Sequence, residues 1–514
     1  MTIQLPKMLN AVPLPVLLLL LSIIIYLILP SRRRLSLPVI NRPPSFLFPH
    51  LRARIATTKD FKSAILLADT HHRNKPVILP ILTGDMVLLP RSDTQWVVEQ
   101  PDTILDMHSL VMETLQIDHT TPDPELVHRP IHHKLITTTL TNQVGNLVPD
   151  VAEETEWSVS KYWDTDSAEG EVCVYKSVFK MVGAVSNRVF IGAPLCRDET
   201  LLQLAGQYAQ IVPMAAVMLR MCWGPVKTVL GAALRARIWI VAKKWERRLG
   251  PEIRARVKEF DESEKAKNDF LGWCIGQAKA MGEPALWSTS TLAGRVLLLN
   301  FAAIHTSSFG LTGAILDLAY GRPQDVDELR EEIEAVLAEN GGEWNKKALA
   351  RMEKLDSVMR ESARLNSFAT VGLGRMVTAR EGVVTPSGVK LPYGTNIAVP
   401  SYAVLHDDDK YPDANEFRPF RFSTQRQDES VEYIKRAAKS FATTSNDYLA
   451  FGHGRNACPG RFFAANELKL MLAHLVLNYD FEPLEKSRPK NMWFGLTRVP
   501  PMEAKIRIRR RVRA

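Results

Sequence analysis

The longest uninterrupted apolar stretch of the chain lies close to its first residue. Residues 11–29 read AVPLPVLLLLLSIIIYLIL and contain no charged side chain. With a helical rise of 1.5 Å per residue they span about 28 Å, which is close to the thickness of a bilayer core. We therefore predict a retained single-pass anchor over residues 1–30. A cleaved secretory signal is the alternative, but it has a shorter apolar run and a small-residue cleavage site.

Charged residues around this stretch predict its orientation. Lys7 is the only charged side chain before it, whereas Arg32, Arg33 and Arg34 follow it directly. Because basic residues stay on the cytosolic side of a membrane, we expect the rest of the chain to be cytosolic. Several prolines then predict a stiff, non-helical tether over residues 31–50.

Helical periodicity dominates the chain after residue 50. Residues 290–321 are apolar almost all round, which predicts a helix buried in a large core. Residues 264–281 alternate charged and apolar positions at helical spacing, and residues 326–339 and 347–367 predict two exposed, charge-laced helices. No linker, repeat or charge block marks a further boundary, so we expect one domain over residues 51–514.

Strand signals come late in the chain and are short. Residues 382–405 contain the turn sequences PSG and YGT between apolar runs, and residues 504–513 alternate basic and apolar side chains. The predicted fold class is therefore mainly α with a minor antiparallel β subdomain. At 46% hydrophobic residues, the chain can bury a sizeable core.

Composition excludes several kinds of protein. The five cysteines form no CxxC pair, so neither a disulfide framework nor a zinc module is indicated, and a reducing compartment is the default. The net charge of +9 is modest for 514 residues and the basic residues are widely spread, which does not favour nucleic-acid binding. With thiols so scarce, the surroundings of each cysteine are informative.

Cys458 has unusual neighbours in the sequence FGHGRNACPG. A helical pattern begins directly after it, so the thiol lies at a helix N-terminus, where the helix dipole and free N–H groups favour a thiolate. Gly452, Gly454 and Gly460 permit close approach of a flat partner, and Arg455 can pair with a carboxylate on that partner. An iron porphyrin meets these demands. A buried free cysteine at a helix cap is the alternative.

This loop resembles the haem-binding loop FxxGxRxCxG of the cytochrome P450 family. The residues that carry the resemblance are Phe451, Gly452, Gly454, Arg455, Cys458 and Gly460. The resemblance implies that Cys458 is the axial ligand of the iron of haem b. It also implies the cytochrome P450 fold behind the N-terminal transmembrane helix.

Two further motifs agree in kind and order. ESAR gives the ExxR pair Glu361 and Arg364, and FRPFR resembles the element that supplies Arg421. Taken alone, such pairs are usually solvated surface charges. The resemblance instead implies a buried Glu–Arg–Arg network that holds the haem-side core.

Residues 302–307, AAIHTS, are similar to the oxygen-binding groove [AG]Gx[DE]T[TS] of the family. By this resemblance Ala302 and Ala303 leave space for dioxygen and substrate, and Thr306 relays protons. Back-bonding to a helix carbonyl is the alternative for such hydroxyls, and it suits Ser308 better than Thr306. Ala303 replaces a common glycine and His305 replaces the usual acid. Because histidine can shuttle protons near neutral pH, His305 is a second candidate for proton delivery.

Other positions follow from the resemblance alone. Arg375 and His132 are the expected partners of the haem propionates, although the spacing of His128 and His132 also leaves a zinc site as an alternative with no third ligand evident. Substrate contacts are expected from Ala302 and Ala303 and from the segment after the ExxR helix, which comprises Phe368, Ala369, Thr370 and Val371. Each of these apolar residues alone would more often be ordinary core.

Together these motifs imply a membrane-anchored haem-thiolate monooxygenase. It would use O2, electrons from an NADPH-dependent cytochrome P450 reductase, and a small lipophilic substrate at the endoplasmic reticulum membrane. Residues 305–308, 405–422 and 451–464 look like the fungal secondary-metabolism branch, in which terpenoid and meroterpenoid oxidation is common. Two alternatives stay open: a haem-thiolate isomerase or dehydratase that uses no O2, and a non-catalytic haem-binding membrane protein.

Overall fold

The computed structural model describes residues 35–44, 47–163 and 169–511. The anchor predicted over residues 1–30 lies outside these ranges. The chain divides into two compact units, and two long helices, α11 (Glu199–Arg220) and α12 (Gly224–Ser263), contain residues of both. Unit 1 comprises Met1–Pro124, Gln210–Ile240 and Leu373–Pro400, and unit 2 comprises Glu125–Ala209, Val241–Gly372 and Ser401–Ala514.

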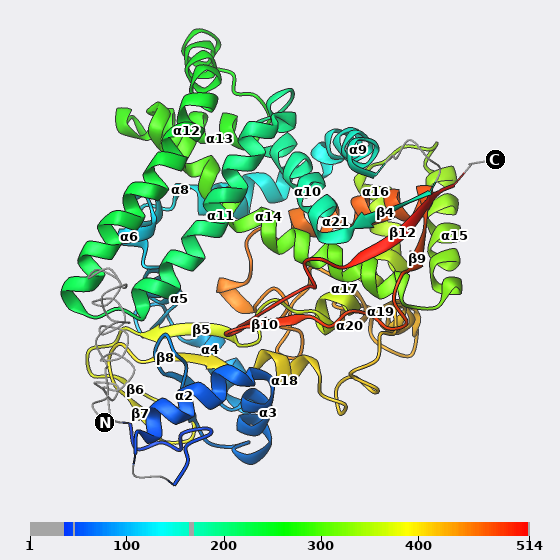
Figure 1. Ribbon diagram of the computed structural model, residues 1–514. Helices are drawn as coiled ribbons and strands as arrows, with labels where there is room; N and C mark the ends of the chain where they lie inside the picture. Colours follow the sequence, from blue (N-terminus) through cyan, green and yellow to red (C-terminus); the bar gives the residue numbers. More distant parts are fainter. Residues whose placement is uncertain (1–34, 45–46, 164–168, 512–514) are drawn as a thin grey trace, which may run out of the picture. The chain divides into compact units, whose positions relative to one another are not determined.

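Unit 1 is built on a five-stranded sheet of order β1-β2-β8-β5-β3 (Figure 1). The β1–β2 and β3–β5 pairs are antiparallel, as predicted for the β subdomain, whereas β2 runs parallel to β8. The strands are β1 (Val77–Leu79), β2 (Met86–Leu88), β3 (Leu105–Asp106), β5 (Gly372–Val377) and β8 (Asn396–Val399), with a separate hairpin of β6 (Val383–Val384) and β7 (Lys390–Leu391).

Part of the predicted tether pairs with this sheet. The Ile78 amide donates to the carbonyl of Pro38 at 2.8 Å, and the Ile40 amide donates to the carbonyl of Ile78 at 3.0 Å. Ile40 is also buried. These residues lie within the tether predicted over residues 31–50 and belong to unit 1. The helices that lie wholly in unit 1 are α2 (Pro49–Lys59), α3 (Phe61–His71), η2 (Arg91–Asp93), α4 (Thr94–Glu99), α5 (Met107–Leu115) and α6 (Ile117–Thr120).

Unit 2 is a helical body with α14 (Thr289–Ala319) at its centre. Helix α14 packs against α10 (Val174–Phe190), α17 (Glu353–Leu365) and α21 (Arg461–Asn478), and α9 (Thr141–Trp163) packs against α10 and α21 (Figure 1). Among the described residues α14 alone is long and apolar enough to cross a membrane, but most of its apolar window is buried. It is therefore a core helix, as its sequence predicts.

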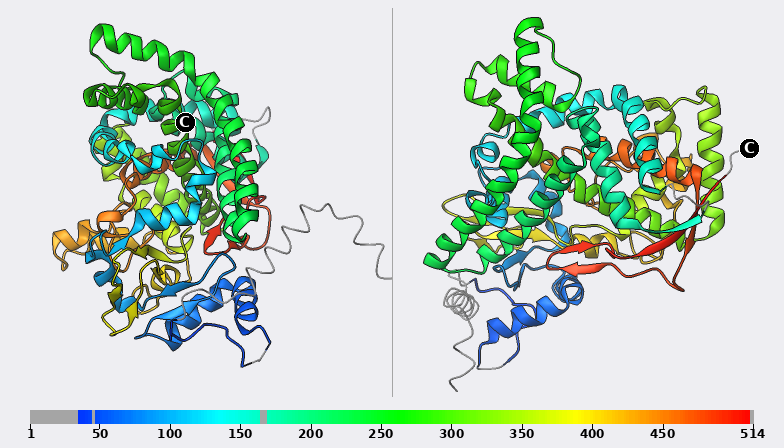
Figure 2. Two further views of the ribbon diagram at one scale, coloured as in Figure 1. Left: turned by 90° about the vertical axis from the view of Figure 1, so that its left-hand side faces the viewer. Right: turned by 45° about the horizontal axis from the view of Figure 1, so that its top comes forward.

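Shorter elements complete unit 2. The strands β4 (Glu169–Cys173), β12 (Lys505–Arg510) and β9 (Tyr479–Pro483) form an antiparallel sheet whose red strands lie side by side (Figure 2), and β10 (Met492–Phe494) pairs with β11 (Thr497–Val499). The remaining helices are α7 (Glu125–His128), α8 (Ile131–Leu135), η3 (Ile136–Leu140), η4 (Leu195–Arg197), α13 (Phe270–Met281), η5 (Pro284–Trp287), α15 (Pro323–Glu339), α16 (Lys346–Arg351), α18 (Ser401–Leu405), α19 (Arg421–Gln427), α20 (Tyr433–Ala437) and η6 (Gly454–Asn456).

Two helix predictions need correction. The helix predicted over residues 264–281 begins only at Phe270, because the Asp269 carboxylate caps it by accepting a bond from the Gly272 amide at 2.8 Å. The helix predicted over residues 347–367 is two helices, α16 and α17, separated at Met352. Most of α17 is buried rather than exposed, because its charged residues pair within the core.

Candidate active site

The loop before α21 fixes the position of Cys458. Gly452 and Gly454 have φ angles of 68° and 73°, in the left-handed region that favours glycine. The Cys458 amide donates to the carbonyl of Phe451 at 2.8 Å and closes the loop. Gly460 is the N-cap of α21, so Cys458 lies two residues before the N-cap and three before the first helical residue, Arg461.

The Cys458 thiol is accessible, although protein atoms surround it closely. Burial raises its pKa, and this effect outweighs the backbone N–H donors of Gly460 and Arg461 and the positive charge of Arg461, which lower it. The helix start therefore supplies the predicted N–H donors, but they do not lower the pKa of Cys458 enough to deprotonate the thiol on their own. A bound metal ion would supply the missing stabilisation by displacing the proton.

This arrangement fits a haem iron better than a chelated metal ion. Within the described ranges no group of three or more His, Cys, Asp or Glu side chains is placed to hold a metal. A thiolate at a helix start, with backbone N–H groups directed at the sulfur, is a protein ligand that suits the iron of a haem, whose remaining ligands come from the porphyrin. The two N–H groups directed at Sγ are the kind of donors that tune a coordinated thiolate.

The expected propionate partners differ in their surroundings. The motif FxxGxRxCxG places its arginine two residues before the cysteine, but here that position is Asn456 and the exposed Arg455 lies one residue earlier. Arg375 is buried on β5, where Nη1 donates to the carbonyl of Gly374 at 2.7 Å. His132 lies on α8 with Nδ1 3.3 Å from Nη1 of Arg295, and burial followed by the charge of Arg295 lowers its pKa to about 4.

Beyond its first turn, helix α14 has exposed residues only in the short stretch around residues 302–306. Ala302 and Thr306 are exposed, Ala303 is half-buried, and Ile304 and Ser307 are buried. Residues 302 and 306 lie one turn apart on the same face of the helix. This face brings small side chains and a hydroxyl together, as the resemblance implies.

Both hydroxyls considered for back-bonding make such a bond. Thr306 Oγ1 donates to the carbonyl of Ala302 at 2.9 Å, and Ser308 Oγ donates to the carbonyl of Ile304 at 2.6 Å. They differ in exposure, because Ser308 is buried and Thr306 is exposed. Only the Thr306 side chain is therefore available to a bound molecule.

The ring of His305 packs against α10. Its Nδ1 is 2.8 Å from the hydroxyl of Tyr175 on α10, and its Nε2 is buried without a hydrogen bond among the described residues. Phe179 and Phe309 lie against the ring, with centroids 5.0 and 5.9 Å away. Burial lowers the pKa of His305 to about 4, so the imidazole is neutral at neutral pH. This geometry does not favour the predicted role as a proton shuttle.

The segment after α17 is divided between two roles. Phe368 is 38% exposed, and its ring centroid lies 5.6 Å from that of Phe309 on α14. Ala369 and Val371 are half-buried. Thr370 is fully buried, and its hydroxyl donates to the carbonyl of Leu496 at 2.6 Å. Thr370 therefore holds the segment in place. The sequence predicted that Thr370 contacts the substrate, but its side chain is buried and cannot do so.

The three residues of the predicted charge network are in contact. The Glu361 carboxylate accepts two bonds from Arg364, each 2.8 Å long, and one from Nε of Arg421 at 3.0 Å. Glu361 and Arg364 are completely buried. Arg364 also donates to the backbone carbonyls of Leu405 and Ala414, at 2.6 and 2.7 Å.

Sequence reasoning missed Tyr175 and Glu467. Tyr175 lies 130 positions before its partner His305, so no local pattern could connect them. Glu467 is the only acidic residue of α21 and is buried, and its carboxylate accepts a hydrogen bond from Ser186 at 2.6 Å. The sequence could have indicated Glu467 only as a single acid on an apolar helix, and a charged residue is normally expected to face solvent.

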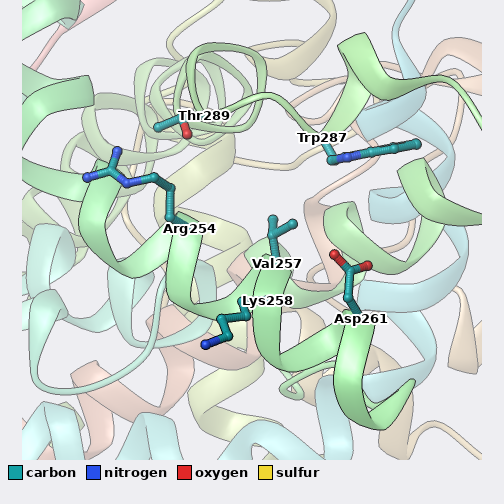
Figure 3. Close-up of a pocket in the computed structure, with 6 residues that line it drawn as sticks. All are labelled: Arg254, Val257, Lys258, Asp261, Trp287 and Thr289. Atoms are coloured by element: carbon teal, nitrogen blue, oxygen red, sulfur yellow. The ribbon is translucent and has the colours of Figure 1, made fainter.

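A pocket of about 210 Å³ lies elsewhere in unit 2 (Figure 3). It is formed by α12, η5 and the first residue of α14, and none of the predicted site residues lines it. Its lining residues are Arg254, Val257, Lys258, Asp261, Trp287 and Thr289. The pocket is therefore separate from the site at Cys458 and Thr306.

Comparisons with known proteins agree with the motifs. A sequence profile described as "Cytochrome P450" matches residues 126–506. "Cytochrome P450 monooxygenase 151" of Postia placenta is 36% identical over 422 residues, which cover 80% of this chain and 81% of that protein. "Cytochrome P450 monooxygenase gloP" of Glarea lozoyensis is 33% identical over 494 residues, covering 90% and 89%. A solved structure titled "Retinoic acid bound cyanobacterial CYP120A1" matches with a TM-score of 0.66 and 17% identity, over 93% of this chain and 100% of that one, which shows a shared fold.

Proposed function

The chain belongs to the cytochrome P450 family, and from this premise we propose that it is a membrane-anchored haem-thiolate monooxygenase of fungal secondary metabolism. The substrate is a lipophilic secondary metabolite of the terpenoid or meroterpenoid class, which the enzyme hydroxylates or oxidises further. The observation that carries the proposal is the accessible Cys458 thiol with the N–H groups of Gly460 and Arg461 directed at it.

The haem would supply reductive activation of O2 when bound. Cys458 would hold its iron through Sγ, and the Gly460 and Arg461 amides would stabilise the negative charge on that sulfur. Arg375, His132 and Arg455 are the proposed partners of the propionates. The network of Glu361, Arg364 and Arg421 would keep the surrounding core rigid without touching the reacting atoms.

Thr306 would act at the exposed face of α14. Its hydroxyl can donate and accept hydrogen bonds at once, so Oγ1 can leave the carbonyl of Ala302 and hold a proton beside a bound oxygen molecule. Ala302 and Ala303 have no side-chain bulk beyond Cβ and would leave room for both oxygen and substrate. The exposed Phe368 and the adjacent Phe309 would form an apolar wall for the substrate.

A bilayer-dissolved substrate suits this site. The residues proposed to face it carry methyl groups and aromatic rings, and they offer no charge to bind a charged ligand. Residues 1–30 would anchor the enzyme next to its dissolved substrate, in the endoplasmic reticulum membrane with the catalytic body cytosolic. An NADPH-dependent cytochrome P450 reductase in the same membrane would supply the electrons.

Reconstitution tests this function. The full chain is expressed in microsomes with a cytochrome P450 reductase, and terpenoid scaffolds are supplied as probes. We expect a product whose mass has increased by oxygen and whose formation requires both NADPH and O2. Product formation without NADPH would favour the isomerase or dehydratase, and no product from any scaffold, with no spectral change on adding them, would favour a non-catalytic haem protein.

A further inference from the structure

The side chain of Asn366 joins two parts of unit 2 at the end of α17. Asn366 is the residue that directly follows this helix, and its Nδ2 donates to Oδ2 of Asp317 on α14 at 2.7 Å. Its Oδ1 accepts from Nδ2 of Asn491 at 2.7 Å and from Nη2 of Arg488 at 3.2 Å. Both of these donors belong to the chain directly before β10. One amide therefore bridges α14 and the chain that leads into the β10–β11 hairpin.

The carboxylate that receives this amide is buried and compensated. Nε of Arg488 lies 2.5 Å from Oδ1 of Asp317, and the Ser362 hydroxyl of α17 donates to Oδ2 at 2.7 Å. A buried charge holds its partners firmly, because the loss of one partner leaves it uncompensated. Asp317 is therefore a fixed point on α14 from which Asn366 is positioned.

Helix α14 leaves room for the amide. Gly313 lies one turn before Asp317, and a Cβ at Gly313 would lie 3.3 Å from Nδ2 of Asn366 and 3.3 Å from Oγ of Ser362. Glycine lets another chain approach the helix backbone this closely. The end of α17 is thus packed directly against α14, and the polar contact at Asp317 fixes its place there.

The segment that begins at Asn366 is the one proposed to face the substrate. The carbonyl of Phe368, two residues further on, accepts from the amide of Arg498 at 2.9 Å. The amide of Thr370 donates to the carbonyl of Leu496 at 3.2 Å. The segment is therefore bonded to the β10–β11 hairpin, and Asn366 holds the chain that enters this hairpin. A shift at Asn366 would reach Phe368 from both directions along the chain.

We propose that Asn366 is a positioning residue: by tying α14 to the chain before β10, its amide sets the place of Phe368 and so determines which position of a bound substrate is presented for oxidation. This inference rests on the proposed monooxygenase function. The ring of Phe368 is exposed and lies against Phe309 of α14, with the centroids 5.6 Å apart. Asn366 acts through this ring, because its own amide is occupied by its protein partners.

The alternative is that Asn366 only ends a helix. Its Nδ2 also contacts the carbonyl of Ser362, four residues earlier, at 3.0 Å. Asn340 makes this same bond after α15, to the carbonyl of Val336 at 2.7 Å, but among the described residues its side chain has no partner on another element. Asn340→Ala is therefore the matched control for Asn366→Ala.

The first measurement needs neither turnover nor a cofactor. Hydrogen–deuterium exchange is recorded on the purified full chain, and we expect Asn366→Ala to speed exchange at the amides of Thr370 and Arg498 about threefold or more. Asn340→Ala should leave both amides unchanged. Unchanged exchange at these amides in Asn366→Ala would overturn the inference. An equal increase throughout α9 and α10 would also overturn it, because the residue would then support the fold in general.

The second measurement compares two azoles that bind a haem iron through nitrogen. Imidazole reports on the iron alone, whereas 4-phenylimidazole also places a ring on the substrate side, so the ratio of their dissociation constants reports on the wall that contains Phe368. We expect Asn366→Ala to change this ratio about threefold or more while imidazole binds as in the wild type. A wild-type ratio in Asn366→Ala, or the same change in Asn340→Ala, would overturn the inference.

An exchange of the two side chains tests the contact itself. Asn366→Asp places a second carboxylate beside Asp317 and should change the azole ratio as Asn366→Ala does. The double variant Asp317→Asn with Asn366→Asp again joins one carboxylate to one amide, so we expect its ratio to return toward the wild-type value. No return would overturn the inference. A wild type that shows no azole spectrum would instead refute the proposed haem function, and the exchange result would still stand on its own.

Discussion

Glu361 shows how a carboxylate can be completely buried. Arg364 and Arg421 donate three hydrogen bonds to it, and Nη1 of Arg364 donates to two backbone carbonyls. A buried charge that is paired and hydrogen-bonded in this way is tolerated, but removal of one partner leaves an uncompensated charge. The network should therefore be sensitive to single substitutions.

We predict that Arg364→Ala lowers the free energy of unfolding by about 3–5 kcal/mol, because Glu361 loses two bonds in a completely buried site. Arg418→Ala is the matched control, since Arg418 pairs with Asp413 and Glu416 on the exposed surface, and it should change the free energy by less than about 0.5 kcal/mol. Urea denaturation measures both. Equal effects of the two substitutions would refute the structural role of the network.

Glu467 makes stability depend on pH in a defined direction. Its pKa is about 8 in the folded chain and 4.5 is its ordinary value. Between these values the folded protein holds a proton that the unfolded chain has lost, so stability falls as pH rises from about 4.5 to about 8. We predict that Glu467→Gln removes this loss of stability. As pH rises from about 4.5 to about 8, the midpoint of thermal unfolding should therefore fall less in the variant than in the wild type. Parallel pH curves for the two proteins would contradict the buried carboxyl.

Single residues differ in how far the sequence alone predicts them. Cys458, Glu361, Arg364 and Thr306 are found from short motifs, because the chemistry depends on residue types at fixed spacings. Tyr175 could not be found in this way, since its contact with His305 depends on how α10 packs against α14. Packing decides the state of His305, and the sequence therefore suggested a proton shuttle where the structure shows a neutral, enclosed ring.

At the scale of elements, the residue at which a helix begins depends on capping side chains, and the periodic pattern of apolar residues does not reveal them. The Asp269 carboxylate caps α13 and also pairs with Nη1 of Arg256 at 2.6 Å, and both residues are buried. The charged positions before Phe270 continued the helical pattern in the sequence, but the cap ends it there. The break between α16 and α17 lies at Met352, whose backbone leaves the helical conformation without a side-chain cap.

We predict that Asp269→Ala lowers the free energy of unfolding by about 3 kcal/mol or more, because it removes the cap and one of the carboxylates that face buried Arg256. Asp60→Ala is the matched control: Asp60 caps α3 by accepting from the Ser63 amide at 2.9 Å, but it is exposed and should cost about 1 kcal/mol. Thermal or urea unfolding measures both. A loss at Asp269 no larger than that at Asp60 would contradict the buried pair.

For the whole molecule, the apolar pattern predicts the class of fold better than it predicts how the chain divides into compact units. Mostly helical content with short sheets is confirmed, because long helical periods and short alternating runs are strong signals. The two compact units were not predicted, since unit 1 is assembled from three separate stretches of chain with no linker between them. Contacts between distant stretches leave no mark in local composition.

The central claim is that Cys458 binds the iron of a haem through its sulfur. Its most direct test is the absorption spectrum of the reduced, carbon-monoxide-bound full-length protein, in which a thiolate ligand gives a red-shifted Soret band. We predict that the wild type and Cys173→Ala, which alters a half-buried thiol on β4, both show this band, and that Cys458→Ala does not. The red-shifted band in Cys458→Ala would contradict the account.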